Sequence, residues 1–425
     1  MKAYRVRTGA ILEILGDPIR ETPILDLTLE RYQEQACREA GLELVDVKSE
    51  DEIRDGAPHV VFRDDLFFTS GYLRLFVKGA GEREGNAVAA LPPTGQWKAL
   101  GALQDHVTIG DTEVRYEDFR YVDPRAADPA ARPILFDTET GYYWRQRWLA
   151  HVLPGVTETF HPVTDRYLLQ IIIPMHVGIA NLWARFDRIS RFYRNPAMEK
   201  VWDFMTWIAR KRNGEEALRK WVDARMHWRA RRGIPRLAYW IMGLRWMNHV
   251  GKDCDIHPSV IMEGCDIGNN VRVGANAYLQ HATIGDGCEI GEYCHLRLCS
   301  IGEGTLIPQI SRVSATVVYP YAFFATRSVN FGIIGREAQI YNSLYSDFRL
   351  DGTSQTTIFR GKVVDAKVPF LGVTVGHRAR VAGGLITAPG RVIPNGVTIL
   401  PPKDLVFVKA PKGVKEGDII RLGEE

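Results

Sequence analysis

Two histidines recur at the same point of a repeating pattern, and each has a side chain that could transfer a proton. His281 and His377 both follow an aliphatic residue of the pattern by two positions. Imidazole suits general-base catalysis because its unperturbed pKa, about 6.5, lies near the working pH of most enzymes. We therefore take His281 and His377 as candidate catalytic residues. His257 and His295 lie directly beside an aliphatic position and are weaker candidates.

A pair of acidic residues could bind a metal ion. Asp64 and Asp65 follow the apolar segment His59 to Phe62, which reads as a strand. Carboxylate oxygens are the ligands that Mg²⁺ prefers, so Asp64 and Asp65 are candidate magnesium ligands. An Asp pair at the end of a strand also suits a solvated turn, and that alternative stays open.

The histidines lie in a repeat that predicts the element holding them. Apolar-Gly pairs recur every 17 residues at Val250-Gly251, Ile267-Gly268, Ile284-Gly285 and Ile301-Gly302, and within each step aliphatic residues fall at intervals of six, six and five. Neither a helix of period 3.6 nor a flat strand of period two fits this spacing. Three short strands per coil fit it, each turning one aliphatic side chain inward. Residues 250–400 are therefore predicted to form a parallel β-helix.

The pattern shifts in register within the repeat. It slips by about six residues from Tyr319 to Ile340 and resumes with the 17-residue spacing at Tyr341. The slipped segment is rich in aromatic and basic residues. It is expected to be either an extruded loop that covers a ligand or an irregular coil with aromatic side chains packed inside. Under the first interpretation Arg327 and Arg336 are candidate substrate-binding residues.

Five of the six cysteines share one position in the repeat, two residues before an aliphatic residue. One packing position thus explains all five, and no Cys-x-x-Cys spacing occurs. We predict buried thiols rather than a metal site or a disulfide framework. The five are Cys254, Cys265, Cys288, Cys294 and Cys299.

The N-terminal region, residues 1–160, alternates helical and strand patterns, which favours an α/β domain with a partly parallel sheet. Asp26 to Gly41 has helical periodicity and ends at a glycine. Tyr72 to Lys78 is a second predicted helix. The predicted strands are Leu42 to Val47, His59 to Phe62 and Asn86 to Leu91.

The middle region, residues 161–249, is basic and rich in tryptophan. From Leu182 to Asn248 there are 16 Lys and Arg residues and 6 Asp and Glu residues, and seven of the ten tryptophans lie there. Arg185, Arg188 and Arg191 fall on a different helical face from the apolar residues. We predict a helical insert with a solvated basic face. A phosphate-capturing surface and a membrane-surface helix are the alternatives.

The repeat resembles the left-handed β-helix of hexapeptide-repeat transferases. The run Leu279 to Gly285 (LQHATIG) is similar to the histidine-bearing run of the O-acyltransferase of lipid A synthesis. The run Val375-Gly376-His377 is similar to that of glucosamine-phosphate acetyltransferase. The resemblance implies the left-handed sense, a homotrimer, an acyl-CoA cosubstrate and a histidine general base. A three-histidine zinc site, as in hexapeptide carbonic anhydrases, is a further possibility that the resemblance raises.

The N-terminal segments PILDLTLERYQEQACREAGLELVDV and VVFRDDLFF resemble sugar nucleotidyltransferases. The order of parts resembles the bifunctional N-acetylglucosamine-1-phosphate uridyltransferase/glucosamine-1-phosphate acetyltransferase family, in which an Asp at a strand end helps hold magnesium. That family opens with a glycine-rich loop whose amides cradle phosphates. Here the corresponding segment, TGAILEILGDPIRETP, has only isolated Gly9 and Gly16. The resemblance therefore implies a degenerate nucleotidyltransferase-like domain.

Three functions follow from these patterns. The leading one is acyl transfer from acyl-CoA to a nucleotide-linked or phosphorylated sugar on the β-helix. The alternatives are a non-catalytic scaffold or regulatory pseudoenzyme and a magnesium-dependent sugar nucleotidyltransferase. Each makes a different prediction about His281, His377, Asp64 and Asp65.

Length and charge bound the remaining possibilities. A chain of 425 residues is too long for one ordinary core, so two or three domains are expected, followed here by a tail at 401–425. The net charge of +3 is too small to imply nucleic acid as a partner of the whole chain. The N-terminus shows no secretory signal pattern. A cytoplasmic protein with a small-molecule substrate is the expectation, and peripheral membrane contact stays open.

Overall fold

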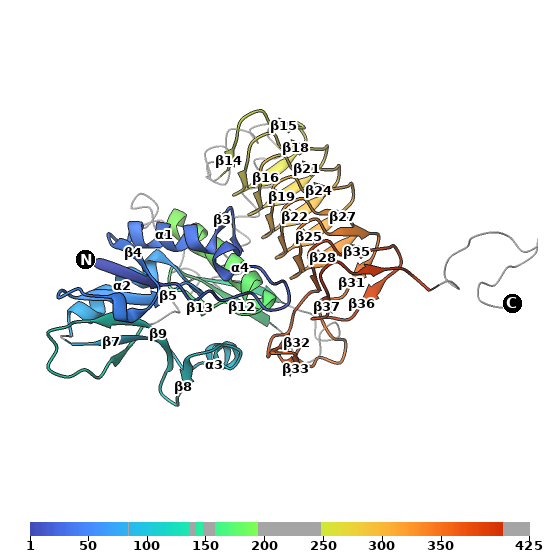
Figure 1. Cartoon of the computed structure of the whole chain (residues 1–425). Coiled ribbons are helices and arrows are strands. Elements are labelled where there is room, and N and C mark those ends of the chain that lie inside the picture. Colours follow the sequence, from blue (N-terminus) through green and yellow to red (C-terminus); the bar gives the residue numbers. More distant parts are fainter. Residues whose placement is uncertain (84, 137–141, 148–157, 194–247, 403–425) are drawn as a thin grey trace, which may run out of the picture.

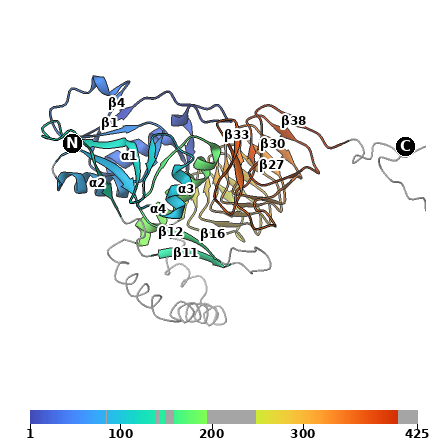
Figure 2. The same ribbon diagram turned by 90° about the horizontal axis from the view of Figure 1, so that it is seen from below.

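The computed structural model describes residues 1–83, 85–136, 142–147, 158–193 and 248–402. It consists of an N-terminal α/β domain and a C-terminal parallel β-helix, which lie side by side with one helix, α4 (Pro174–Tyr193), between them (Figures 1 and 2). The predicted order of an α/β domain followed by a β-helix is confirmed.

The α/β domain is built on a mixed sheet in the order β10-β7-β9-β5-β1-β4, with β8 paired to β9. The pairs β1–β4, β1–β5 and β10–β7 are parallel, whereas β9 runs antiparallel to its neighbours. Its strands are β1 (Lys2–Val6), β4 (Glu43–Val47), β5 (His59–Arg63), β7 (Ala87–Leu91), β8 (Val107–Ile109), β9 (Val114–Val122) and β10 (Arg132–Leu135).

The helices and short pairs of this domain follow the sequence patterns closely. Helix α1 (Leu29–Glu39) starts at Thr28, whose side chain accepts a hydrogen bond from the Arg31 amide, and Gly41 follows it at φ +74°. The other helices and short strands are η1 (Ile19–Glu21), η2 (Glu50–Glu52), α2 (Ser70–Gly81), α3 (Gly95–Gly101), β2 (Pro23–Ile24), β3 (Leu27–Thr28), β6 (Leu66–Phe68), β11 (Tyr142–Arg147), β12 (Glu158–Val163) and β13 (Leu168–Gln170).

The region predicted as a helical insert, residues 161–249, divides into two parts. Its first residues belong to the α/β domain, because β13 pairs with β6. Helix α4 then begins at Pro174, a residue suited to the first helical turn. Residues 194–247, which carry most of the tryptophans, lie outside the described residues. The predicted tail at 401–425 lies outside them from residue 403 onward. No described helix is long and apolar enough to cross a membrane.

The β-helix stacks its coils so that strands from successive coils pair in parallel, 17 residues apart in the first coils, as the repeat predicts. The spacing is 16 residues between β26 and β29 and 18 between β34 and β37. We call the face turned toward α4 the docking sheet. Its strands are β14 (His249–Val250), β17 (Asp266–Ile267), β20 (Thr283–Ile284), β23 (Ser300–Ile301), β26 (Val317–Val318), β29 (Ile333–Ile334), β34 (Thr374–Val375) and β37 (Val392–Ile393).

Two further faces close the prism. The second consists of β15 (Asp255–Ile256), β18 (Arg272–Val273), β21 (Glu289–Ile290), β24 (Leu306–Ile307), β27 (Phe323–Ala325), β30 (Gln339–Tyr341), β35 (Arg380–Val381) and β38 (Thr398–Ile399). The third consists of β16 (Ile261–Glu263), β19 (Tyr278–Gln280), β22 (His295–Arg297), β25 (Arg312–Ser314) and β28 (Ser328–Asn330), and then of the separate pair β31 (Leu344–Tyr345) and β36 (Ile386–Thr387).

Of the two interpretations of the segment from Tyr319 to Ile340, the extruded loop is wrong, because the segment forms strands β27 to β30 of the coils. Phe324 is fully buried in the prism, so the alternative of aromatic side chains packed inside the coil is confirmed. The chain instead leaves the coils after β31 and returns at β34. Within this excursion β32 (Thr356–Phe359) and β33 (Lys362–Asp365) form an antiparallel hairpin. One residue is missing between β26 and β29, and this accounts for part of the register slip.

The cysteines of the repeat confirm their predicted packing role. All six cysteines are free, and four of the five in the repeat are buried in the prism, where their burial raises the thiol pKa. A raised pKa keeps a thiol protonated and poorly reactive. Among the described residues no group of three or more His, Cys, Asp and Glu side chains is placed to hold a metal ion.

The two domains share one apolar core. Val317, Tyr319 and Ile333 of the β-helix are buried in the same cluster as Val177 and Ala180 of α4. Burying aliphatic and aromatic side chains contributes about 1.5–3 kcal/mol each. The α/β domain and the β-helix are therefore one packed body rather than two linked units.

Candidate functional site

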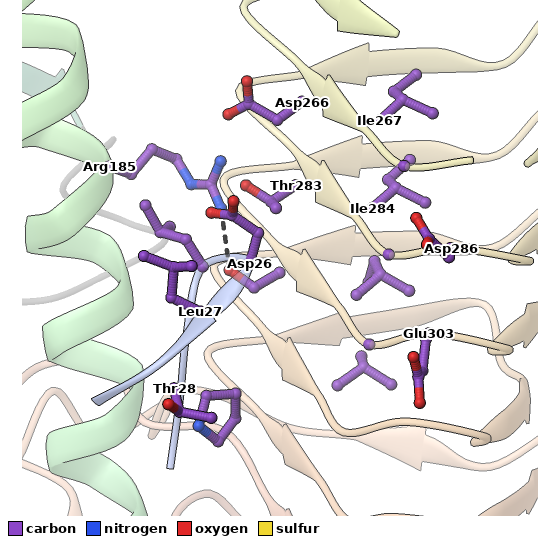
Figure 3. A pocket seen from close by; sticks show the side chains of 18 of the residues that line it. Asp26, Leu27, Thr28, Arg185, Asp266, Ile267, Thr283, Ile284, Asp286 and Glu303 are labelled. Carbon is purple, nitrogen blue, oxygen red and sulfur yellow. Dashed lines mark hydrogen bonds between the residues drawn. The ribbon is translucent and has the colours of Figure 1, made fainter. Parts of the chain in front are cut away.

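A cavity of about 1260 Å³ opens where α4 and the β2–β3 segment face the docking sheet (Figure 3). The upper coils of the docking sheet form one wall, with Asp266, Thr283 and Ser300 as the first residues of successive strands. These residues are in register across the sheet, so their side chains form a ladder on one face. Ligand cavities of proteins commonly measure about 300–1,000 Å³, so this one has room for a small-molecule substrate.

Helix α4 supplies the opposite wall through arginines at helical spacing. Arg188 makes ion pairs with both Asp26, which precedes β3, and Asp266 of β17. Arg185 donates from Nη2 to the Cys299 carbonyl oxygen at 2.9 Å and to Ser300 Oγ at 3.0 Å. These contacts fix the helix on the docking sheet and set the width of the cavity between them.

The basic face of α4 was predicted to be solvated, and this is wrong for its first arginine. Arg185 is only 3% exposed. Burial lowers its pKa to about 10, so the guanidinium remains charged at neutral pH. Arg188 and Arg191 are each about one-third exposed and each pairs with two carboxylates, those of Arg191 being Glu39 and Asp187.

His281 lines this cavity at the corner between β19 and β20. Its backbone is left-handed, at φ +48°, and the ring lies against Gly264 of the coil before it. A Cβ on Gly264 would lie 2.5 Å from His281 Nδ1, so the glycine makes room for the imidazole. Desolvation, followed by the nearby charge of Arg185, lowers the pKa of His281 to about 4. The imidazole is therefore neutral at physiological pH, and in the absence of a ligand it is a weaker base than an exposed histidine.

His377, the other candidate base, is engaged at both ring nitrogens. Nδ1 accepts a hydrogen bond from the Arg336 amide at 2.8 Å, which leaves the proton on Nε2. Nε2 then donates to Asp17 Oδ2 at 2.7 Å. His377 is also buried, with its ring edge-on to Tyr319. Its geometry joins the β-helix to the N-terminal loop and leaves no free lone pair for catalysis.

The two candidate substrate-binding arginines are placed differently. Arg336 lines the cavity and lies 3.8 Å from Asp17 Oδ1 through Nη2, with its side chain 43% exposed. Arg327 is exposed at a corner of the β-helix before β28 and does not line the cavity. The structure therefore brings Arg336 and His281 to the same cavity and leaves Arg327 outside it.

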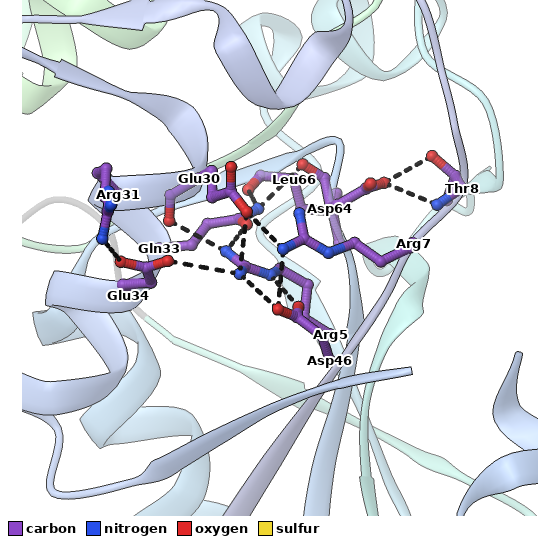
Figure 4. Close-up of polar contacts among 10 residues, drawn as sticks. All are labelled: Arg5, Arg7, Thr8, Glu30, Arg31, Gln33, Glu34, Asp46, Asp64 and Leu66. Atoms are coloured by element: carbon purple, nitrogen blue, oxygen red, sulfur yellow. Dashed lines mark hydrogen bonds and ion pairs between the residues drawn. The ribbon is translucent and has the colours of Figure 1, made fainter. Parts of the chain in front are cut away.

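The acidic pair of the α/β domain is occupied by protein partners. Asp64 Oδ1 accepts from the Thr8 amide at 3.1 Å and from Thr8 Oγ1 at 2.6 Å (Figure 4). Asp65 pairs with Arg63 at 2.8 Å and accepts from Gln170 Nε2 at 2.9 Å. Both residues are buried. These contacts satisfy the carboxylates without a metal and argue against the predicted magnesium site.

The edge of the sheet beside Asp64 is filled by a charge network. Arg5, only 1% exposed, binds both carboxylate oxygens of Asp46 and the side chain of Gln33 (Figure 4). Arg7 pairs with Glu30 and Asp46. In a nucleotidyltransferase this edge would need free donors for phosphate. Here acidic side chains of the chain itself take up the cationic groups.

The segment in place of a glycine-rich loop is a docking element. Leu12 and Leu15 are buried in the shared core. The Leu15 carbonyl oxygen accepts a hydrogen bond from Asn395 Nδ2 at 2.7 Å, and Asp17 holds His377. The segment therefore contacts the last coils of the β-helix through Leu15 and Asp17.

Several residues of the site were not predicted from the sequence. The roles of Asp17, Asp26 and Asp266 depend on contacts between segments far apart in the chain, and a single sequence carries no signal for such contacts. A partial signal exists for Thr283, because the residue before each aliphatic position of a docking-sheet strand points outward. The helical spacing of the α4 arginines predicted that they share one side of the helix. It did not predict that this side packs against the docking sheet.

A second cavity of about 710 Å³ lies on the other side of α4. It is lined mainly by apolar side chains, including Ile179, Leu182 and Phe331, with Lys98 and Lys367 also lining it. None of the residues predicted from sequence lines this second cavity. The chemistry-bearing side chains gather in the first.

A comparison with known protein families finds the same hexapeptide repeat that the sequence pattern predicts. A family model described as bacterial transferase hexapeptide (six repeats) matches residues 264–298, the segment that contains His281. The matched segment lies within the β-helix and spans strands β17 to β22. No curated protein matches the chain.

Solved structures similar to this chain include PerB and the acetyltransferase domain of PglB. PerB from Caulobacter crescentus, in complex with CoA and GDP-perosamine, is 17% identical with a TM-score of 0.17, covering 36% of this chain and 52% of that chain. The acetyltransferase domain of PglB from Neisseria gonorrhoeae FA1090 is 16% identical with a TM-score of 0.13, covering 36% of this chain and 52% of that chain. The chain thus spans about half the length of the solved structures it matches.

Proposed function

We propose that the protein transfers an acyl group from acyl-CoA to a hydroxyl or amine of a phosphorylated or nucleotide-linked sugar, in the cavity between α4 and the docking sheet. The observation that carries this proposal is His281, a neutral imidazole on the wall of a cavity large enough for a substrate. The hexapeptide transferase match, which spans His281, supports it.

The proposed reaction gives His281 one role. Its imidazole takes the proton from the acceptor hydroxyl or amine while that oxygen or nitrogen attacks the thioester carbonyl carbon. A new C–O or C–N bond forms, the C–S bond breaks, and the departing thiolate of CoA receives the proton. Such general-base catalysis contributes about 10²–10⁴-fold to a rate. Because burial and Arg185 keep the imidazole neutral, no proton has to be lost before substrate binds.

A scaffold or regulatory role remains the second candidate, and one observation favours it. The N-terminal loop is bound to the last coils through the hydrogen bonds Asp17–His377 and Leu15–Asn395, which join the two domains. Such an arrangement would suit a protein that presents a fixed surface. It does not explain the neutral histidine and the buried arginine beside an open cavity.

The nucleotidyltransferase alternative has less support. The carboxylates of Asp64 and Asp65 are engaged, and the segment that would form the phosphate loop packs on the β-helix. The proposed acyl transfer does not require Mg²⁺. The homotrimer implied by the hexapeptide resemblance remains a proposal, which the mass of the particle in light scattering tests.

The test combines binding and turnover. Acetyl-CoA is titrated calorimetrically into the purified protein, and CoA release is then followed with a thiol reagent across a panel of amino-sugar phosphates and nucleotide sugars. Saturable binding near one acetyl-CoA per chain, with acceptor-dependent CoA release, supports acyl transfer. Absence of both would leave the scaffold as the better proposal. Magnesium-dependent release of pyrophosphate from a nucleotide and a sugar phosphate would revive the nucleotidyltransferase.

A further inference from the structure

The cavity holds a buried positive charge, Arg185, that has no ion-pair partner among the described residues. Arg185 is 3% exposed, and among the described residues no carboxylate lies within 4.0 Å of its guanidinium. Its Nε is buried without a hydrogen-bond partner there. Arg188, one turn further along α4, differs because it pairs with two carboxylates. A buried charge without an opposite charge beside it is costly, so this guanidinium is suited to an anionic ligand.

A second unpaired donor lies beside the first. Thr283 is 2% exposed, lines the cavity, and its Oγ1 has no hydrogen-bond partner among the described residues. Thr283 of β20 is in register with Ser300 of β23, which Arg185 contacts. Neighbouring strands are about 4.8 Å apart, so the hydroxyl lies close to the guanidinium. Figure 3 shows Arg185 reaching from α4 toward the strand that bears Thr283.

The acidic residues of the cavity leave this corner free for an anion. Asp26 and Asp266 share ion pairs with the single guanidinium of Arg188, and Asp266 also contacts His249. Asp286 lies along the docking sheet and accepts a hydrogen bond from the Asn269 amide at 2.7 Å. An anionic group would therefore go to Arg185, while the acidic wall could accept hydrogen bonds from hydroxyl groups.

We propose that Arg185 and Thr283 form a subsite for a phosphoryl group of the ligand. The inference rests on the proposed function for the identity of the ligand as a phosphorylated or nucleotide-linked sugar, but phosphate binding can be measured without any acyl transfer. Charged oxyanions make the strongest hydrogen bonds with guanidinium groups. The phosphoryl group would use two donors, Arg185 Nε and Thr283 Oγ1, that have no partner in the described part of the chain.

The subsite also couples ligand binding to the base. His281 is surrounded by Arg185 of α4, by Glu263 of β16 and by Arg297 of β22, and the first and last of these lower its pKa. A phosphoryl group on Arg185 would offset that positive charge. The pKa of His281 is then expected to rise on binding, which makes the imidazole a stronger base when substrate is present.

The experiment measures the binding of inorganic phosphate, with sodium acetate and sodium chloride at matched ionic strength. Wild type is expected to bind phosphate saturably. Arg185→Gln and Thr283→Val should each weaken it, by about tenfold to a hundredfold for the arginine. Arg185→Lys should recover part of the affinity. Thr387→Val is the matched control, because Thr387 is also buried with an unpartnered Oγ1 but lies outside the cavity.

A spectroscopic readout separates a binding role from a structural one. The ¹H–¹³C signal of the His281 ring is titrated with pH, with and without phosphate. Phosphate should raise the His281 pKa in wild type and leave it unchanged in Arg185→Gln. If Arg185→Gln does not fold, Thr283→Val carries the test. Equal binding of acetate and phosphate, or full phosphate affinity in Thr283→Val, would overturn the inference. Phosphate binding without acyl transfer would overturn the proposed function alone.

Discussion

The two ends of the docking sheet present the same repeat to different partners. At the upper coils, β17 to β23 face α4 across an open cavity, and His281 has a neutral ring on its wall. At the lower coils, β29 to β37 meet the N-terminal loop, and His377 is bonded at both nitrogens. One end is arranged to receive a ligand, and the other is closed by the chain itself.

The difference between the two histidines arises from the segment that packs against each of them rather than from the repeat itself. His281 and His377 share a position in the pattern and each follows an inward aliphatic residue by two. Asp17, 360 residues away in sequence, converts the second into an inter-domain contact. A histidine in a hexapeptide coil is therefore a catalytic candidate only once its neighbours are known.

The strongest test of the comparison replaces the histidine of the open end. His281→Asn keeps a residue that tolerates the left-handed backbone, so folding should be preserved. Turnover is expected to fall by about 10²–10⁴-fold with the melting temperature nearly unchanged. CoA release measures it. The control is His295→Asn, on the third face of the prism, which should have the turnover of the wild-type protein. Equal losses of turnover in both variants would contradict a catalytic role for His281.

The closed end should respond in stability. His377→Ala leaves Asp17 and the Arg336 amide without their partner in a buried site, so the free energy of unfolding should fall by about 2–4 kcal/mol. Urea denaturation measures it. His257→Ala, at an exposed position, should change stability by less than about 0.5 kcal/mol. A His377→Ala protein as stable as wild type would show that the contact does not join the domains.

A pair of glycines separates ring placement from backbone strain. Gly264 and Gly287 both have φ +64°, but only a Cβ on Gly264 would meet the His281 ring. Gly264→Ala should lower turnover by about tenfold or more by displacing the imidazole. Gly287→Ala should cost stability only, about 1 kcal/mol. Similar kinetics in the two variants would contradict the placement of His281.

The pH dependence follows from the lowered pKa of His281. A base with a pKa of about 4 stays neutral down to pH 5, so kcat/KM should hold there, whereas a histidine near its usual 6.5 would lose about tenfold at pH 5.5. Folding stability should fall as the pH drops from 6.5 toward 4, because the unfolded chain binds the proton first. A pH–rate profile with an acid limb near 6.5 would place the working base elsewhere.

The smallest expected effect concerns the predicted arginine outside the cavity. Arg327→Gln should alter kcat/KM by less than about twofold, because an exposed side chain away from the ligand contributes little. Steady-state kinetics measure it. A large rise in KM would mean that the substrate extends beyond the cavity to the corner before β28.

The sequence predicted those features that depend on local pattern. The 17-residue spacing defined the coils, the cysteine positions marked their interior, and the helix ending at Gly41 was placed within a few residues. The excursion after β31 was not predicted, because the 17-residue spacing that resumes at Tyr341 next falls on Ile358, which lies in the β32–β33 hairpin. Spacing alone cannot distinguish a coil from a strand that happens to share its phase.

The site was harder to predict because it forms between domains. Histidine positions came from the repeat, but the choice between His281 and His377 required Asp17 and the cavity. Arg185 resembled its neighbours on a basic helix face until packing buried it. The carboxylates of Asp64 and Asp65 were recognised, whereas their partners Thr8 and Gln170 could not be.

Hydrogen–deuterium exchange with and without acetyl-CoA tests the contrast between the two ends most directly. With acetyl-CoA bound, exchange should slow in peptides from 264–302 and from α4, and it should not change in peptides from 374–399. Protection confined to 374–399, or saturable binding that protects neither region, would contradict the assignment of the cavity as the ligand site.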